Sequence, residues 1–240
     1  MNSWLASLGN ALMGLGEFVR PQGFFMRRTV TQQVYFTAVQ AFWLVNSLGL
    51  VLGILVALPL LGLGLTDVAL QATVMKVALF HQLSPLLTAW VVIGRSGTAL
   101  TAELGEFHYG GVLDSLRMLG LDPERFILLP RLLAITFSLL VLTFWTNMAA
   151  VLGAGVYNWT VNGVSLLGYV LACTAVVEPL ETLLTAVMVM AYGCAIVLVQ
   201  NRYGLRASNV VELQRNLPRA FVRSLQWCVG LTLFFTMVRS

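Results

Sequence analysis

Long apolar runs separated by short polar segments make up most of this chain. No charged residue occurs from Thr29 to Thr66, and residues 77–94, 132–177 and 182–201 are further uncharged runs. About 18–20 consecutive apolar residues suffice for a helix that crosses a membrane. The pattern predicts five transmembrane helices, with Pro85 as a kink in the second. We place them at residues 38–63, 74–100, 127–151, 183–199 and 220–238.

The segments between these runs carry helix and turn signals. Thr66-Asp67 is a helix-cap signal, and residues 158–163 predict a turn. Residues 164–177 are apolar, but this stretch is shorter than a span. They form either a helix on the outer side of the membrane or the outer end of the fourth span.

The first residues predict a helix that lies in the membrane interface, over residues 1–25. Apolar residues recur there at helical spacing, and Pro21 and Gly23 then break the pattern. The residues that form this apolar face are Trp4, Leu5, Leu8, Leu12, Leu15 and Val19.

Composition and charge agree with a membrane protein. Of the 240 residues, 58% are hydrophobic and 10% are charged, whereas about 25% are charged in an average soluble domain. With five spans, nearly all arginines fall on one side, and only Lys76 and Arg239 fall on the other. The positive-inside rule therefore predicts a cytoplasmic N-terminus and a C-terminus on the outer side.

Residues 94–126 hold an unusual share of the charge and lie between the second and third spans. Their middle predicts a short amphipathic helix, with Asp114 and Arg117 as an i,i+3 pair. Gly120 is a helix stop, and Asp122-Pro123 begins the next helix. This short helix either docks a soluble partner or lies on the lipid surface. Its apolar stripe consists of Val112, Leu113, Leu116 and Leu119.

Motifs for catalysis, ATP binding or metal binding are absent from the sequence. There is no GxxxxGK[ST], GxSxG or HExxH motif, and no His cluster. The arginines form no dense patch, which disfavours nucleic acid as a partner. We therefore expect no enzyme activity in this chain, no metal and no cofactor. Arg95 and Glu103, near the inner end of the second span, are either functional or paired, or they reach the headgroup level.

Five linked motifs follow one another along the chain: LSPLLTA (83–89), GRSGTA (94–99), AELG (102–105), DSLRMLGLDP (114–123) and PRLLA (130–134). Together they resemble the MlaE/YrbE-type permease, the membrane subunit of ABC transporters that work with MCE-domain proteins. The resemblance implies one permease domain over residues 1–240, which usually dimerises. It also implies that residues 111–120 are a coupling helix that contacts the ATPase through Leu113, Asp114, Leu116, Arg117, Leu119 and Gly120.

The resemblance also implies the function and the partners. We expect a subunit of the bacterial inner membrane that moves phospholipid or a similar lipid between that membrane and an MCE-domain protein. A separate ABC ATPase would drive transport, a small STAS-type subunit could join, and a second permease copy would complete a homodimer or a heterodimer. We expect the lipid path to be bordered by Ile54, Leu58, His81, Gln82 and Leu83.

The chain departs from the family pattern at three places. His81-Gln82 stands where many relatives have Arg-Glu, and Ser84 stands where they have Gly. Gly110-Gly111-Val112 replaces the usual start of the coupling helix, and residues 207–212 replace a glycine-rich motif. The alternative function is a membrane scaffold that assembles such a complex without moving lipid. A channel or ion-coupled carrier would require more charge within the spans than this chain has.

Overall fold

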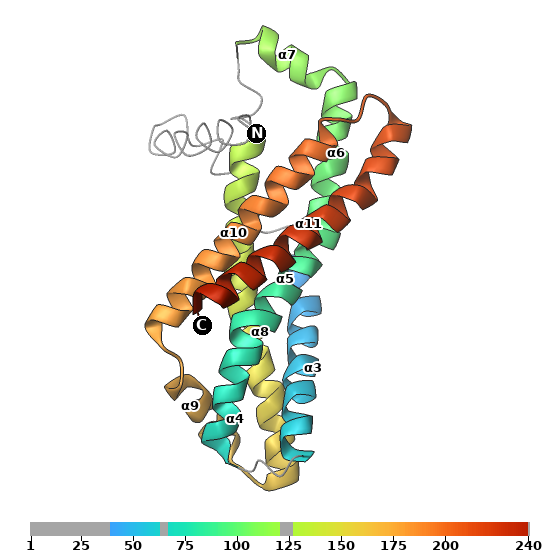
Figure 1. The fold of residues 1–240 in the computed structure, drawn as a ribbon. Helices are drawn as coiled ribbons and strands as arrows, with labels where there is room; N and C mark the ends of the chain where they lie inside the picture. Colours follow the sequence, from blue (N-terminus) through green and yellow to red (C-terminus); the bar gives the residue numbers. More distant parts are fainter. Residues whose placement is uncertain (1–38, 63–66, 121–126, 240) are drawn as a thin grey trace. The chain divides into compact units, whose positions relative to one another are not determined.

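The computed structural model describes residues 39–62, 67–120 and 127–239, and these residues form helices with no strand among them (Figure 1). The predicted interfacial helix at 1–25 and the predicted helix start at Asp122-Pro123 lie outside the described residues. The helices in chain order are α3 (Gln40–Gly62), α4 (Val68–Val74), η3 (Met75–Leu83), α5 (Ser84–Val92), η4 (Ile93–Gly97), α6 (Thr98–Tyr109), α7 (Val112–Met118), α8 (Leu129–Asn162), α9 (Leu166–Ala175), α10 (Pro179–Gly204) and α11 (Val210–Arg239). The elements η3 and η4 are π-helices.

Five helical stretches in the described part of the chain are long and apolar enough to cross a membrane. They are Ala41–Leu60, Val68–Tyr109, Leu129–Asn162, Pro179–Gly204 and Val210–Arg239. The prediction of an all-α membrane protein with five spans is therefore confirmed. The second stretch is a continuous helical run from α4 to α6 that includes both π-helices and is longer than the predicted 74–100.

Asp67 caps the second helical stretch, as the sequence predicted. Its side chain accepts a hydrogen bond from the Ala69 amide at 3.0 Å. This bond satisfies one of the amides that a helix start leaves without a partner. The helix consequently begins at Val68, ahead of the apolar run from which the span was predicted.

The prediction of a turn at 158–163 is wrong for all but its last residue. Helix α8 continues to Asn162, and the chain turns at Gly163, which has a φ of 67°. The asparagines remain helical because their side chains bond within the helix: Asn158 Nδ2 donates to the Ala154 carbonyl at 3.1 Å. Residues 164–177 contain a separate helix, α9, which Ser165 caps.

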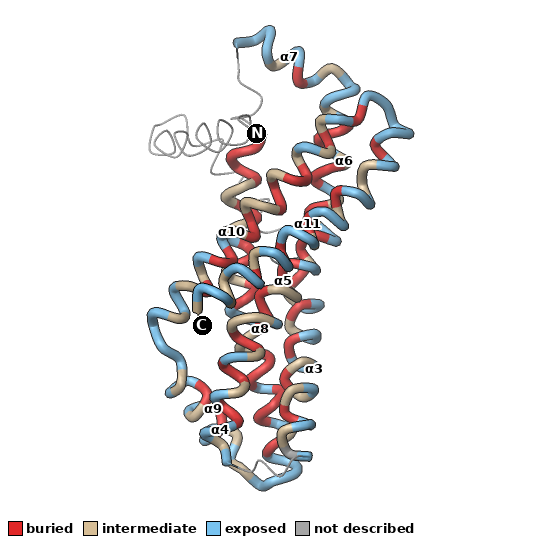
Figure 2. The backbone as a smooth tube through the Cα atoms, viewed as in Figure 1, coloured by how far each residue is buried: buried red, intermediate tan, exposed pale blue. Residues whose placement is uncertain are grey.

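The chain divides into two compact units, and α8, α10 and α11 contribute residues to both. Unit 2 comprises Ala38–Val91, Leu139–Ala191 and Val229–Ser240. Its core is formed by small and large apolar side chains of α3, α4, η3, α8 and α9, which are buried (Figure 2). Helices α3 and α8 come so close that a Cβ added at Gly53 would lie 1.9 Å from the Ala150 carbonyl oxygen.

Unit 1 comprises Val92–Ser138 and Tyr192–Cys228 among its described segments. Its interior includes a buried polar contact: the Thr101 hydroxyl bonds to the side chain of Gln200, which donates to Ser224 Oγ at 3.1 Å. Gly97 leaves room for the Gln200 side chain, since a Cβ there would meet its Nε2 at 2.9 Å. Away from water, such polar groups are stable only when they bond to one another.

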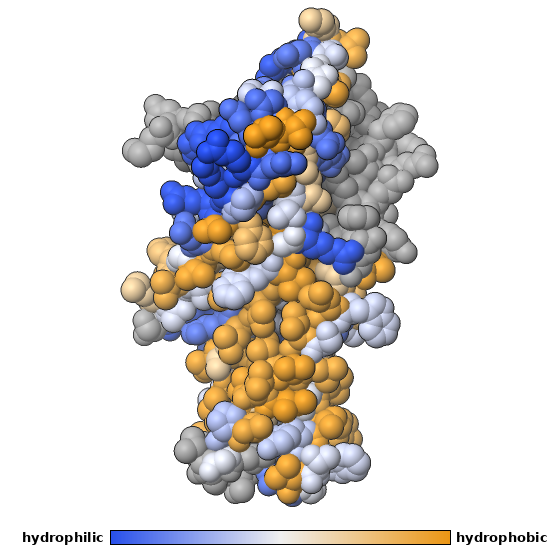
Figure 3. Space-filling view, turned by 90° about the vertical axis from the view of Figure 1, so that its right-hand side faces the viewer, coloured by the Kyte–Doolittle hydropathy of each residue, from blue (hydrophilic) through white to orange (hydrophobic). Residues whose placement is uncertain are grey.

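The surface carries far more apolar side chains than a soluble protein exposes. Trp43 is 81% exposed, and Phe234 and Met237 are 60% and 77% exposed. Figure 3 shows hydrophobic side chains covering a continuous area of the face drawn, with the hydrophilic side chains gathered apart from them. An exposed apolar area of this kind is typical of a surface that contacts lipid.

We expect Gly53→Ala to destabilise the protein, because the added methyl group would overlap the backbone of α8. Overpacking of this kind costs about 1–3 kcal/mol. Thermal unfolding of the detergent-solubilised protein measures the effect. Gly230→Ala in α11 is the matched control, because a Cβ at Gly230 meets nothing within 4 Å and alanine favours the helix. Equal melting temperatures for the two variants would contradict the prediction.

Candidate functional site

Helix α7 in unit 1 is a short helix bounded by two glycines in the left-handed region. Gly111 precedes it with a φ of 73°, and Gly120 follows it with a φ of 75°. Only glycine adopts such values readily, so both ends are determined by the sequence. The predicted helix stop at Gly120 and the predicted pair are confirmed, with Arg117 Nη1 3.0 Å from Asp114 Oδ1.

The apolar residues of α7 divide into an inward and an outward set. Leu113 is 5% exposed, whereas Met118 and Leu119 are 88% and 74% exposed. The stripe predicted from sequence is therefore not one surface: Leu113 anchors α7 to the rest of unit 1, and the outward residues remain accessible. Leu113 lines a small pocket together with Arg117, Leu104, Leu128, Asn201 and Leu205.

Glu103 makes an ion pair with Arg131 in unit 1. Arg131 Nη2 lies 2.5 Å from Glu103 Oε1, and the Arg131 side chain is 6% exposed. The guanidinium also lies 5.9 Å from the centre of the Phe107 ring, within cation–π range. The sequence left Glu103 either functional or paired, or reaching the headgroup level, and the structure shows it paired with Arg131. Arg95, in η4, is exposed.

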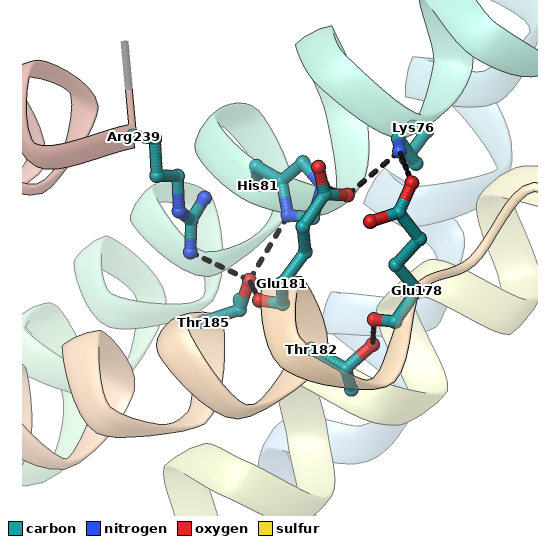
Figure 4. Close-up of polar contacts among 7 residues, drawn as sticks. All are labelled: Lys76, His81, Glu178, Glu181, Thr182, Thr185 and Arg239. Carbon is teal, nitrogen blue, oxygen red and sulfur yellow. Dashed lines mark hydrogen bonds and ion pairs between the residues drawn. The ribbon is translucent and has the colours of Figure 1, made fainter.

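Unit 2 contains a charged cluster, which we define as Lys76, His81, Glu178, Glu181, Thr185 and Arg239 (Figure 4). Its centre is the Glu181 carboxylate. One oxygen of that carboxylate lies 2.7 Å from Lys76 Nζ and 3.2 Å from His81 Nε2. Glu178 lies at the edge, with its carboxylate 3.7 Å from the same ammonium group.

Hydrogen bonds extend this cluster to the C-terminal end of α11. Arg239 Nη2 donates to Thr185 Oγ1 at 2.8 Å, and the same hydroxyl lies 3.0 Å from His81 Nδ1. Both ring nitrogens of His81 therefore have a partner, and the Thr185 hydroxyl itself donates to the Glu181 carbonyl at 2.9 Å. Elements η3, α10 and α11 are thereby joined by polar contacts within unit 2 (Figure 4).

The π-helical form of η3 brings Lys76 and His81 to the same carboxylate. These residues are five apart in sequence. Because a π-helix bonds residue i to residue i+5, one of them lies about one turn above the other. In an α-helix of 3.6 residues per turn they would point about 140° apart. Sequence reasoning based on α-helical spacing could not place them together.

The residues predicted to border the lipid path all belong to unit 2. His81 joins the charged cluster, while Gln82 is half-buried and Leu83 is 40% exposed. Ile54 is half-buried and Leu58 is 50% exposed on α3, which packs against η3. The structure therefore brings the two helices of the predicted path together.

Tyr169 and Cys173 of α9 are buried and belong to the core of unit 2. Burial raises the pKa of the Cys173 thiol to about 11, and burial also raises the pKa of Tyr169 above its ordinary value. Both groups are uncharged at neutral pH, so Cys173 is not an activated nucleophile. Among the residues that the structure describes, no three His, Cys, Asp or Glu side chains gather as a metal site requires.

Sequence reasoning missed the partners of His81 and the outward position of Met118. Glu178 and Glu181 are about 100 residues from Lys76 and His81 along the chain, and no local pattern connects them. A usable signal was nevertheless present. Lys76 is the only lysine, it lies inside an apolar run, and a cation placed there requires an acidic partner.

Comparisons with known proteins show what the chain is similar to. Residues 30–238 match the family model described as Permease MlaE. The chain is 39% identical over 94 residues to Protein TRIGALACTOSYLDIACYLGLYCEROL 1, chloroplastic, of Arabidopsis thaliana. The aligned region covers 37% of this chain and 27% of that protein. This chain is 31% identical over 117 residues to the intermembrane phospholipid transport system permease protein MlaE of Haemophilus influenzae. That aligned region covers 48% of this chain and 44% of the relative.

Each of these alignments spans less than half of the relative's length. A probable ABC transporter permease protein of Synechocystis is 40% identical over 70 residues, which cover 29% of this chain and 27% of that protein. The family match, by contrast, extends over most of the chain and includes all five candidate spans. This chain belongs to the MlaE permease family.

Proposed function

We propose that this permease is the membrane subunit of an ABC lipid transport complex. It moves phospholipid or a similar lipid between the inner membrane and an MCE-domain partner. The observation that carries the proposal is the family match over residues 30–238. It is supported by the relative from Haemophilus influenzae, whose name assigns it to intermembrane phospholipid transport.

The proposal includes partners that supply what this chain lacks. The sequence has no GxxxxGK[ST] motif, so a separate ABC ATPase hydrolyses ATP. A second permease copy, identical or different, and a small STAS-type subunit complete the complex. The N-terminus lies in the bacterial cytoplasm and the C-terminus on the periplasmic side, as the distribution of arginines favours. The whole chain acts as one permease domain.

Helix α7 is the element proposed to dock the ATPase. Leu113 fixes it to unit 1, while Leu119 and the Asp114–Arg117 pair are exposed. Leu116 is half-buried beside them, and Gly120 ends the helix. An exposed apolar residue beside accessible charges is suited to a groove on a soluble partner. A helix lying on the lipid surface remains the alternative that the first experiment tests.

The proposed lipid path follows the face where α3 packs against η3. Ile54, Leu58 and Leu83 supply apolar surface, while His81 and Gln82 supply the polar groups. Moving a lipid requires an apolar surface with a few polar groups and no catalytic side chain. Arg95 and Glu103 lie in unit 1, and the Arg131–Glu103 pair has a structural role in this proposal.

We expect Arg117→Glu to reduce the amount of ATPase that co-purifies with the permease by about tenfold. A reversed charge at an interface costs on the order of 1.4 kcal/mol or more, which is a factor of ten. The fold should persist, because Arg117 is 64% exposed and its pair with Asp114 is a surface pair. Quantitative pull-down from membranes, with permease expression measured in parallel, gives the result.

A charge swap separates docking from helix stability. The double variant Asp114→Arg, Arg117→Asp retains an i,i+3 pair on α7 but reverses the charges shown to a partner. We expect the swap to remain defective, and recovery of wild-type pull-down would mean that the pair serves only the helix. Arg215→Glu, an exposed arginine of α11, is the matched control for loss of positive charge.

We expect photo-crosslinking residues placed at Ile54, Gln82 and Leu83 to capture lipid in an ATP-dependent manner. Leu233 and Phe234 of α11 are 60% exposed and serve as controls for contact with bulk lipid. Capture at the controls should not respond to ATP. Equal ATP responses at path and control sites would count against the assigned path.

The same purified complex distinguishes transport from scaffolding. A permease that moves lipid should show ATPase activity that increases when lipid is added, together with ATP-dependent lipid transfer to the MCE-domain partner. A scaffold subunit would support assembly with neither effect, and that outcome would overturn the proposed function.

A further inference from the structure

The positively and negatively charged side chains of the charged cluster in unit 2 differ in exposure. The Lys76 side chain is 10% exposed, whereas the Glu181 and Glu178 side chains are 32% and 67% exposed. The Lys76 side chain is therefore mostly covered by the protein, whereas both carboxylates and part of Arg239 are accessible. Apart from Arg239, which bonds to Thr185, the charges that this cluster exposes are negative.

The charges of the cluster balance in number, although their exposure differs. Lys76 and Arg239 offset Glu178 and Glu181, so the cluster is neutral overall when His81 is neutral. Both carboxylates are nevertheless on the accessible side, and Glu178 holds Lys76 only at 3.7 Å. The Glu178 carboxylate can therefore contact a second cation without breaking the 2.7 Å pair of Lys76 with Glu181.

The cluster also lies among residues proposed for the lipid path. His81 belongs to both, and Leu180 and Leu183, which flank Glu181 along α10, are 67% and 61% exposed. Apolar surface next to an accessible carboxylate matches a lipid whose head group carries a positive charge. An anionic head group would meet like charge there, in surroundings with little water to screen it.

We propose that Glu178 and Glu181 make this permease select lipids with an ammonium-bearing, zwitterionic head group over anionic lipids. Glu178 binds the ammonium group, and Glu181 holds Lys76 and His81 so that neither cation attracts an anionic lipid. The proposal rests on the proposed function, because it requires that lipid passes beside His81. It makes Glu178 a residue that contacts substrate and Glu181 a positioning residue.

The test uses the full complex in vesicles of equal phosphatidylethanolamine and phosphatidylglycerol content, with a photo-crosslinking residue at Leu83. We expect wild type to capture phosphatidylethanolamine in excess. Glu178→Gln should lower the ratio of the two captured lipids by about two- to fivefold, the range for one exposed charge pair. Glu181→Gln should lower it further, because Lys76 then attracts the anionic lipid.

Two further variants keep the test decisive. Glu178→Asp retains the charge and should retain the wild-type ratio, which a purely structural role would not require. Glu106→Gln, an exposed glutamate of α6 in unit 1, removes the same charge and should leave the ratio unchanged. If Glu181→Gln does not fold, the Glu178 variants still decide the question.

The outcomes separate this inference from the proposed function. An unchanged ratio in Glu178→Gln, with lipid still captured in an ATP-dependent manner, overturns the selectivity and leaves the transport proposal standing. A wild type that captures no lipid in response to ATP overturns both. A ratio that falls equally in Glu106→Gln shows a general charge effect and also overturns the selectivity.

Discussion

The ion pair between Lys76 and Glu181 is the contact on which the polar structure of unit 2 depends. A nearly buried ammonium group is stable only beside a carboxylate, and Glu181 supplies that carboxylate at 2.7 Å. The same oxygen receives His81 because η3 is a π-helix. A π-helix of nine residues is unusual, and it commonly accompanies a functional position. The ion pair and the π-helix therefore support each other: the carboxylate binds two residues that only this helical form aligns.

Unit 1 satisfies its polar groups by the same principle with different residues. Gln200 lies between Thr101 and Ser224, and Arg131 bonds to Glu103. Each of these side chains comes from a helix long and apolar enough to cross a membrane. Where water is scarce, a polar side chain within such a helix must bond to its own chain. Interhelical bonds of this kind also fix which helix faces meet, as the glycines do at Gly97 and Gly53.

The sequence predicted the elements better than the contacts between them. Apolar runs longer than a span are a strong signal, and Asp67, Gly111 and Gly120 determine helix ends through local chemistry. The turn at 158–163 failed because Asn158 and Asn162, which favour turns locally, bond within α8 instead. The inward position of Leu113 and the pairing of Glu103 with Arg131 depend on packing between distant segments. The charged cluster was also hard to predict because η3 is a π-helix. The spacing of an α-helix would place Lys76 and His81 on different faces.

The departure at His81-Gln82 from the Arg-Glu of similar permeases can be explained by the same contacts. The Arg-Glu pair that the resemblance leads one to expect and the His-Gln pair of this chain carry the same net charge when the imidazole is neutral. Beside His81, Lys76 on η3 and Glu181 on α10 supply one cation and one carboxylate. Because the ammonium group lies on η3 and the carboxylate on α10, the charge of the site depends on a contact between two helices. A change in that contact would alter which sign of charge the site exposes, and the Lys76–Glu181 distance is therefore the coordinate to follow as the transporter works.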